Sequence, residues 1–207
     1  MGVLLSGRGS NFLALQQAIS RGDLSAEIAV VVSNRDDASG LDAARRLGLP
    51  AVAVPKIGGA SRHDHEQQVL AVLEDASVDW ICLAGYMRLL SAEFVARFPR
   101  RIVNIHPSLL PSFPGLRVHE QVIEHGSRVS GCTVHLVDAG LDSGPIVRQT
   151  PVAVASDDDA DSLAARVLAA EHDTYWRAMR DLTTRHWVLR GRRLCFLDGE
   201  PEGWPGA

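Results

Sequence analysis

The sequence has few cysteines and no long apolar run. Its three cysteines, Cys82, Cys132 and Cys195, are widely spaced, and neither a CxxC pair nor a Cys/His spacing typical of a metal site occurs. This usage is typical of reduced, mostly buried thiols in a cytosolic protein, so we expect a cytoplasmic location and no metal. No apolar run approaches the roughly 18 residues that a membrane span requires, and no signal peptide is recognisable. We therefore expect no membrane partner.

The sequence also lacks a strong excess of either charge. The net charge is -4 over 207 residues, and no basic stripe marks a nucleic-acid footprint. The hydrophobic fraction of 46% and the charged fraction of 22% are ordinary for a soluble globular protein. A net negative charge still allows an anionic small-molecule substrate, because anion binding depends on local basic residues and helix N-termini.

Short apolar runs alternate with helical patterns along the first part of the chain. The expected strands are 3–5, 28–33, 51–54, 80–84 and 101–106, and the expected helices are 12–19, 41–47, 61–76, 91–98 and 118–125. Two further strands, 129–137 and 146–154, flank a loop, and a helix at 162–182 and a β-like stretch at 187–197 follow. We therefore expect one α/β domain over residues 1–207: a doubly wound, mostly parallel sheet with an antiparallel C-terminal hairpin and a long C-terminal helix.

A glycine-rich turn, Ser6–Asn11, joins the first strand to the first helix. Its glycines let the backbone approach a phosphate, and Ser10 or Asn11 is expected to cap the helix or donate to the phosphate. The P-loop lysine is missing, and Phe12 stands where a dinucleotide fingerprint needs its third glycine. A single phosphate is therefore favoured over NAD, although a plain tight turn that binds nothing has the same pattern.

The segment from Asn104 to Pro111 begins at the end of an expected buried strand. Asn104 and His106 are two residues apart, so an extended backbone projects them to the same face, and Pro107 keeps His106 extended. Ligands of open α/β sheets bind at this end of the strands, and an amide beside an imidazole suits a carbonyl that becomes an oxyanion. A capping or turn pair would show the same spacing.

The loop between the last two strands supplies a carboxylate. Asp142 could hold or relay a proton there, because Gly140 and Gly144 leave its loop free to turn the side chain inward. A surface aspartate in a turn is the alternative.

Other polar clusters have ordinary explanations. His63 and His65 lie near a helix start but do not share a helix face, so we expect solvated surface residues. The acidic run 157–161 fits a helix N-terminus. The apolar loop 85–90 is either core or ligand pocket, and Ser112–Arg117 is either a mobile lid or a simple connector.

Six segments together resemble the folate-dependent formyltransferase family, and within it the phosphoribosylglycinamide formyltransferases. They occur in the order and at the spacing seen in that family: Ser6–Asn11, Leu83–Leu90, Asn104–Pro111, Phe113–Gly115, Leu141–Pro145 and Ala170–His172. The resemblance covers nearly the whole chain. It implies a Rossmann-like fold and formyl transfer from 10-formyltetrahydrofolate, the co-substrate, to the amine of glycinamide ribonucleotide in de novo purine (IMP) biosynthesis.

The resemblance also implies roles for particular residues. Asn104, His106 and Asp142 would be the catalytic trio. The ribonucleotide would be bound by Gly9, Ser10, Asn11 and Glu171. The folate would be held by Arg62, Met87, Arg88, Leu89, Leu90, Asn104, Asp138, Ala139, Gly140, Leu141 and Asp142.

Two other function classes stay open from the sequence. A formyltetrahydrofolate hydrolase would use water in place of the amine, but it has no use for a phosphate cradle. A non-catalytic mononucleotide-binding module would have no reason to place Asn, His and Asp at strand ends. The formyltransferase relatives with an additional domain fit this length less well, and the expected state is a monomer or a homodimer.

Overall fold

The computed structural model describes residues 1–56, 58–59, 61–201 and 203. The chain divides into two compact units, Met1–Asn104 and Ile105–Ala207, and the boundary lies inside one strand. Each unit is described by itself.

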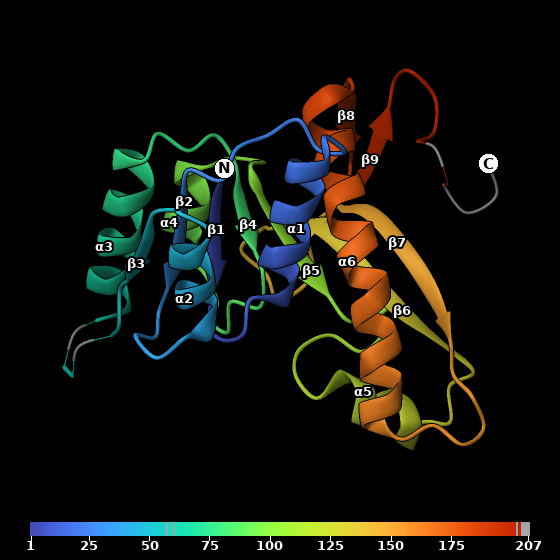
Figure 1. Ribbon diagram of the computed structural model, residues 1–207. Helices are drawn as coiled ribbons and strands as arrows, with labels where there is room; N and C mark the ends of the chain where they lie inside the picture. The colour runs from blue at the N-terminus through green and yellow to red at the C-terminus, as the bar shows by residue number, and fades with distance from the viewer. Residues whose placement is uncertain (57, 60, 202, 204–207) are drawn as a thin grey trace. The chain divides into compact units, whose positions relative to one another are not determined.

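The first unit alternates strands and helices. Its elements are β1 (Gly2–Leu5), α1 (Ser10–Arg21), β2 (Val30–Ser33), α2 (Ser39–Arg46), β3 (Ala51–Ala53), α3 (Arg62–Asp75), β4 (Ile81–Leu83), α4 (Ala92–Arg97) and the start of β5 (Ile102–His106) (Figure 1). All strand pairs here are parallel, in the order β3-β2-β1-β4-β5.

The strand order reverses direction at β1, because β2 and β3 lie on one side of it and β4 and β5 on the other. Right-handed crossovers then place α1 and α2 on one face of the sheet and α3 and α4 on the opposite face. An ion pair joins Arg97 of α4 to Glu74 of α3, and His63 Nδ1 lies 3.1 Å from Glu93 Oε2. The loops after β1 and β4 diverge at this reversal, which is where open α/β sheets bind ligands.

The core of the first unit comes from continuous apolar strands. Val3, Leu4 and Leu5 of β1 are fully buried, as a strand covered on both faces requires. The helices add large buried side chains, among them Phe12 and Leu73. This agrees with the expectation for a parallel sheet.

The second unit begins with the last residues of β5, Ile105 and His106. Its other elements are α5 (Val118–Glu124), β6 (Val129–Leu136), β7 (Ile146–Ala153), α6 (Ala160–Thr184), β8 (Trp187–Arg190) and β9 (Arg193–Phe196). The strands β6 and β7 form an antiparallel hairpin, and the 25-residue helix α6 packs along it (Figure 1). The expected mostly parallel α/β fold, with its antiparallel hairpin and long helix, is confirmed.

A buried ion pair joins β7 to α6. The Arg148 guanidinium donates to Asp181 Oδ2 at 3.0 Å, and both side chains are almost fully buried. Burial raises the pKa of the Asp181 carboxyl, and the Arg148 charge opposes that shift. Separating these two side chains would leave a buried charge without its partner, which is costly. The pair therefore holds α6 in place against β7.

One sequence prediction needs correction. His65 is buried rather than solvated, and its Nε2 donates to the Val54 carbonyl at 2.7 Å. The expected β character of 187–197 is confirmed: the stretch forms two strands, with the turn residue Gly191 at φ 62°. The cysteines agree with expectation: all three are free, Cys82 and Cys132 are buried, and Cys195 is partly exposed.

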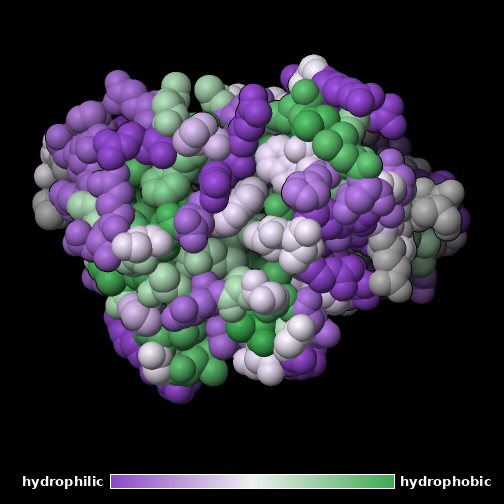
Figure 2. Space-filling view, turned by 90° about the horizontal axis from the view of Figure 1, so that it is seen from above, coloured by the Kyte–Doolittle hydropathy of each residue, from purple (hydrophilic) through white to green (hydrophobic). Residues whose placement is uncertain are grey.

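Exposed apolar side chains are scattered. On the face shown in Figure 2, hydrophilic and hydrophobic residues are interspersed. Among the described residues, no helix is both long and apolar enough to cross a membrane.

Candidate active site

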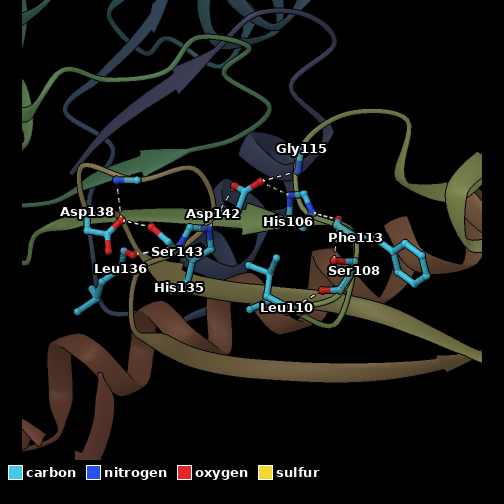
Figure 3. Close-up of polar contacts among 12 residues, drawn as sticks. His106, Ser108, Leu110, Phe113, Gly115, His135, Leu136, Asp138, Asp142 and Ser143 are labelled. Carbon is cyan, nitrogen blue, oxygen red and sulfur yellow. Dashed lines mark hydrogen bonds and ion pairs between the residues drawn. The ribbon is translucent and has the colours of Figure 1, made fainter. Parts of the chain in front are cut away.

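His106 lies at the carboxyl end of β5 and is almost fully buried. Its Nε2 donates to the Phe113 carbonyl at 2.9 Å, and its Nδ1 lies 3.4 Å from Asp142 Oδ2 (Figure 3). Both ring nitrogens therefore face oxygen acceptors, an arrangement that suits a protonated ring. Asn104 lies two residues earlier on the same strand, as expected.

Asp142 lies in the loop between β6 and β7 and points at His106 (Figure 3). Its backbone is left-handed, with φ 47°, which is uncommon for a residue with a side chain. The same Oδ2 accepts from the Gly115 backbone N–H at 2.9 Å, so two contacts hold it in place. Its side chain is about 11% exposed, so of the two alternatives the carboxylate turns inward and is not a surface aspartate.

His135 on β6 faces the other oxygen of the same carboxylate. Its Nε2 lies 3.8 Å from Asp142 Oδ1, and its Nδ1 donates to the Leu136 carbonyl at 3.0 Å. Burial lowers the pKa of His135, although the carboxylate opposes that shift. Burial also lowers the pKa of His119 on α5, although the neighbouring Glu120 carboxylate opposes that shift. Sequence reasoning missed both histidines; only the alternation of β6 could have placed His135 on an inward face.

A polar network supports the turn that follows β5. The Ser108 hydroxyl donates to the Ser112 carbonyl at 2.5 Å. The Thr133 hydroxyl donates to the Ser108 carbonyl at 2.6 Å and accepts from the Leu110 N–H at 3.0 Å. Gln149 Nε2 donates to the Leu110 carbonyl at 2.9 Å. These bonds fix the backbone between His106 and Phe113, so the acceptor for His106 is held in place.

The loop 138–142 holds five of the expected folate residues. Asp138 Oδ1 accepts from the Gly140 N–H at 3.0 Å and from the Ser143 hydroxyl at 2.7 Å (Figure 3). Arg192, in the turn between β8 and β9, donates to the Ser143 carbonyl. Leu141 and Gly140 are exposed, so backbone and apolar surface of this loop are available to a ligand.

The turn after β1 in the first unit differs from one expectation. Gly9 occupies the N-cap of α1 at φ 73°, and no side chain caps the helix, so neither Ser10 nor Asn11 is the cap. Glycine fits because this backbone is left-handed and an added Cβ would lie 3.2 Å from the Gly40 Cα. The first turn of α1 carries no acidic residue, so its N–H groups and helix dipole favour an anion.

The loop after β4 carries four more of the expected folate residues, Met87, Arg88, Leu89 and Leu90. Ser6 ties it to β1: its N–H donates to the Gly85 carbonyl at 3.0 Å, and its hydroxyl accepts from the Met87 N–H at 2.8 Å. Met87 is 67% exposed and Leu89 is 59% exposed, whereas Leu90 is buried. Two large exposed apolar side chains fit the ligand-pocket reading for these positions rather than the core reading. Arg62 reaches the same loop and donates to the Leu89 carbonyl at 2.7 Å.

Glu171, the fourth expected ribonucleotide residue, lies on α6 and is buried. The pKa of the Cys132 thiol is raised to about 11, mainly by burial. The nearby Glu171 charge raises it as well. In the described part of the chain, no three His, Cys, Asp or Glu side chains gather as metal ligands would.

Fold and site together define an α/β protein with an imidazole–carboxylate pair at the carboxyl end of a sheet strand. The model of the formyl transferase family matches residues 1–179, and the chain belongs to that family. It is 38% identical over 210 residues to the phosphoribosylglycinamide formyltransferase of Escherichia coli, covering 98% of this chain and 96% of that protein. It is 46% identical over 179 residues to the trifunctional purine biosynthetic protein adenosine-3 of Drosophila melanogaster, covering 86% of this chain but only 13% of that longer protein.

Among solved structures, glycinamide ribonucleotide transformylase 1 from Symbiobacterium toebii is 45% identical, with a TM-score of 0.92. The match covers 95% of this chain and 93% of that one. The likeness therefore extends over almost the whole chain of each.

Proposed function

We propose that this protein transfers the formyl group of 10-formyltetrahydrofolate to the amine of glycinamide ribonucleotide, giving the N-formyl product and tetrahydrofolate in purine biosynthesis. The observation that carries the proposal is the His106–Asp142 pair at the end of β5, two residues after Asn104. The identity to named phosphoribosylglycinamide formyltransferases and the matching fold support it. The cytoplasmic location is part of the same proposal.

In this proposal the amine nitrogen of the ribonucleotide attacks the formyl carbon. Asn104 and protonated His106 donate to the oxygen that becomes negative, and such donors act strongly in a buried site. Asp142 orients His106 through Nδ1 and moves a proton from the attacking nitrogen to the leaving folate nitrogen. The carbon–nitrogen bond to the folate then breaks.

The present contacts of His106 add one requirement. Its Nε2 donates to the Phe113 carbonyl, so donation to the substrate oxygen through that nitrogen requires this bond to lengthen or to be shared. Phe113 and Arg117 both have left-handed φ of 52°, in the loop that carries this acceptor. We therefore propose that the segment 112–117 shifts when substrates bind.

The binding residues divide between the substrates. Gly9, Ser10 and Asn11 at the N-terminus of α1 bind the phosphate, and Glu171 binds elsewhere on the ribonucleotide. The folate contacts the loops 87–90 and 138–142, where exposed apolar side chains and backbone groups are available, and Arg62 supplies a cation for its anionic part.

The test is the absorbance change of 10-formyl folate, followed with and without glycinamide ribonucleotide. Loss of the formyl group only when the ribonucleotide is present supports the proposal. Formate release without the ribonucleotide would assign a hydrolase instead. Binding of either ligand with no turnover would leave a binding module.

A further inference from the structure

Glu66 on α3 is a buried carboxylate that the proposed chemistry does not use. It is 6% exposed and lies one turn after Arg62 on the same helix. Its Oε1 accepts from Arg62 Nε at 3.0 Å and from the Ser91 backbone N–H at 2.9 Å, and its Oε2 accepts from the Ser91 hydroxyl. Three donors therefore converge on one carboxylate, which compensates for its burial.

The first of these contacts fixes the direction of a guanidinium. Arg62 is 47% exposed along its side chain, yet it is held at two points, by Glu66 through Nε and by the Leu89 carbonyl through Nη2. A guanidinium has five N–H donors in a rigid fork, so these two bonds leave the remaining N–H groups with a defined direction. An unrestrained arginine side chain loses rotamer entropy when it binds a ligand. Arg62 is already restrained in the free protein, so its entropy loss on binding is smaller.

The other contacts fix the loop that precedes α4. Ser91 follows Leu90 directly, and its hydroxyl accepts from the Phe94 N–H at 3.1 Å to cap α4. By holding Ser91 through two donors, Glu66 anchors the end of the loop whose Met87 and Leu89 side chains are exposed. One carboxylate thus positions both the cation and the apolar loop beside it.

We infer that Glu66 is a positioning residue for the folate, acting through Arg62 and Ser91 without touching the ligand. The inference rests on the proposed function, because it takes Arg62 and the loop 87–90 as folate contacts. A carboxylate is the group that a pre-directed guanidinium binds best, and the glutamate part of a folate supplies carboxylates. Glu66 therefore contributes to affinity for the glutamate-bearing end and not to the formyl transfer itself.

The main test is Glu66→Gln, which removes the charge and keeps the size. We expect the KM for 10-formyl folate to rise about two- to tenfold, the cost of ordering one long side chain on binding. The kcat and the KM for the ribonucleotide should stay within about twofold. A 10-formyl pteroate, which lacks the glutamate, should bind the variant and the wild type equally, because the amide oxygen of the new side chain can still accept from Ser91 and keep the loop in place.

The matched control is Glu74→Gln, which removes another carboxylate of α3 that bonds an arginine, Arg97 of α4. That pair is exposed and lies at the far end of the helix, so the KM for the folate should not change. A folate KM that rises equally in both variants, or equally for the pteroate, would overturn the inference, since a general loosening of α3 would do the same. An unchanged folate KM in Glu66→Gln would overturn it as well.

A second variant, Arg62→Lys, keeps the charge but cannot bond Glu66 and Leu89 in the same fork. It should reproduce the glutamate-dependent loss, and adding Glu66→Gln to it should cost little more. Full additivity of the two losses would show that Glu66 does not act through Arg62.

Equilibrium binding of the folate, followed by fluorescence, separates this inference from the proposed function. Folate binding that weakens in Glu66→Gln, without any turnover by the wild type, would sustain the inference and reject the transferase. Turnover by the wild type, with a folate affinity that is the same in Glu66→Gln, would support the transferase and reject the inference. No folate binding at all would overturn both.

Discussion

Asp142 is the residue on which the candidate chemistry depends most directly. One oxygen of its carboxylate faces His106 and the Gly115 N–H, and the other faces His135. A carboxylate held this way can orient the His106 imidazole, while burial lowers the pKa of the second imidazole, that of His135.

Replacing Asp142 with Asn should lower kcat by about 10² or more, because the amide keeps the bond to Gly115 but cannot take a proton. Steady-state turnover at saturating substrates measures this. Asp138→Asn is the comparison: its carboxylate faces Gly140 and Ser143 in the same loop, so it should change the folate KM more than kcat. Equal losses of kcat in both variants would argue that the loop, not the carboxylate, matters.

Asn104→Ala should lower turnover by about 10²–10³, the usual cost of one lost oxyanion donor. The melting temperature should be measured beside the rate, since Asn104 lies in a strand of the sheet. Normal turnover in a folded variant would remove Asn104 from the catalytic trio.

Single residues were predictable where a local rule governs them. The shared face of Asn104 and His106 follows from the two-residue repeat of a strand, whereas Asp142 was singled out by the family resemblance. The burial of His135 and His65 was not predictable, because it depends on which distant parts of the chain pack against each ring. Capping of α1 was one of two roles expected for Ser10 or Asn11. The left-handed Gly9 is the N-cap instead, and the helix begins at Ser10, two residues earlier than expected.

Among the elements, α6 shows most clearly how a sequence signal becomes structure. Asp159 caps it, accepting from the Ser162 N–H at 2.8 Å, while the Ser162 hydroxyl accepts from the Asp159 N–H at 3.1 Å. The acidic run that precedes α6 was predicted as a helix N-terminus, and it is one.

Asp159→Ala should lower the melting temperature by about 2–4 °C, the usual effect of losing a helix cap in a chain of this size. Asp157→Ala is the matched control two residues earlier in the same run; Asp157 is exposed and is not part of the capping box. Thermal unfolding followed by circular dichroism measures both. A control that falls as far as the test variant would point to the charge of the run rather than to the cap.

The hairpin β6–β7 depends on a close approach that only glycine permits. A Cβ on Gly144 would lie 1.8 Å from the Leu136 carbonyl oxygen, at the start of the loop that carries Asp142 on its other side. Periodicity and caps predicted the element boundaries within a few residues. A close backbone contact was not predictable, because its only sign in the sequence is the glycine itself.

Gly144→Ala should therefore reduce both stability and turnover, because the backbone must move to admit the methyl group. Gly126→Ala is a useful comparison, since nothing lies within 4 Å of its Cβ although its φ is 64°. Its loss of stability should be smaller and turnover normal. Comparable turnover in the two variants would mean that the loop tolerates the shift.

Over the whole molecule, histidines whose pKa is lowered by burial or partial burial should shape the dependence of stability on pH. Burial lowers the pKa of His119, His135 and His172 in the folded state. The unfolded chain therefore binds more protons as the pH falls through about 6.5, the ordinary histidine pKa, and folding stability falls with it. The lowered pKa values of Asp64 and Asp159 add a further loss only nearer pH 4.

We expect the melting temperature to decrease between about pH 7 and pH 5.5, before the carboxylates titrate. Replacing His135 by Asn, which keeps a donor for the Leu136 carbonyl, should make that decrease smaller. NMR titration of the His135 ring gives its pKa directly. A value above 6.5 would contradict the explanation.

The whole-molecule fold was predictable because alternating apolar runs and helices allow few topologies. The sequence could not predict how one carboxylate comes to lie between two histidines, since that depends on the bend of a loop.

The free cysteines offer a practical benefit. Cys82 and Cys132 lie in the cores of their units, whereas Cys195 on β9 is partly exposed. A thiol-reactive fluorophore should therefore label the folded protein at one position without engineering, and at three positions after denaturation. The dye would sit on the same hairpin as Arg192, whose guanidinium bonds the Ser143 carbonyl. Changes in its emission on mixing with ligands would report events in the neighbouring loop in real time.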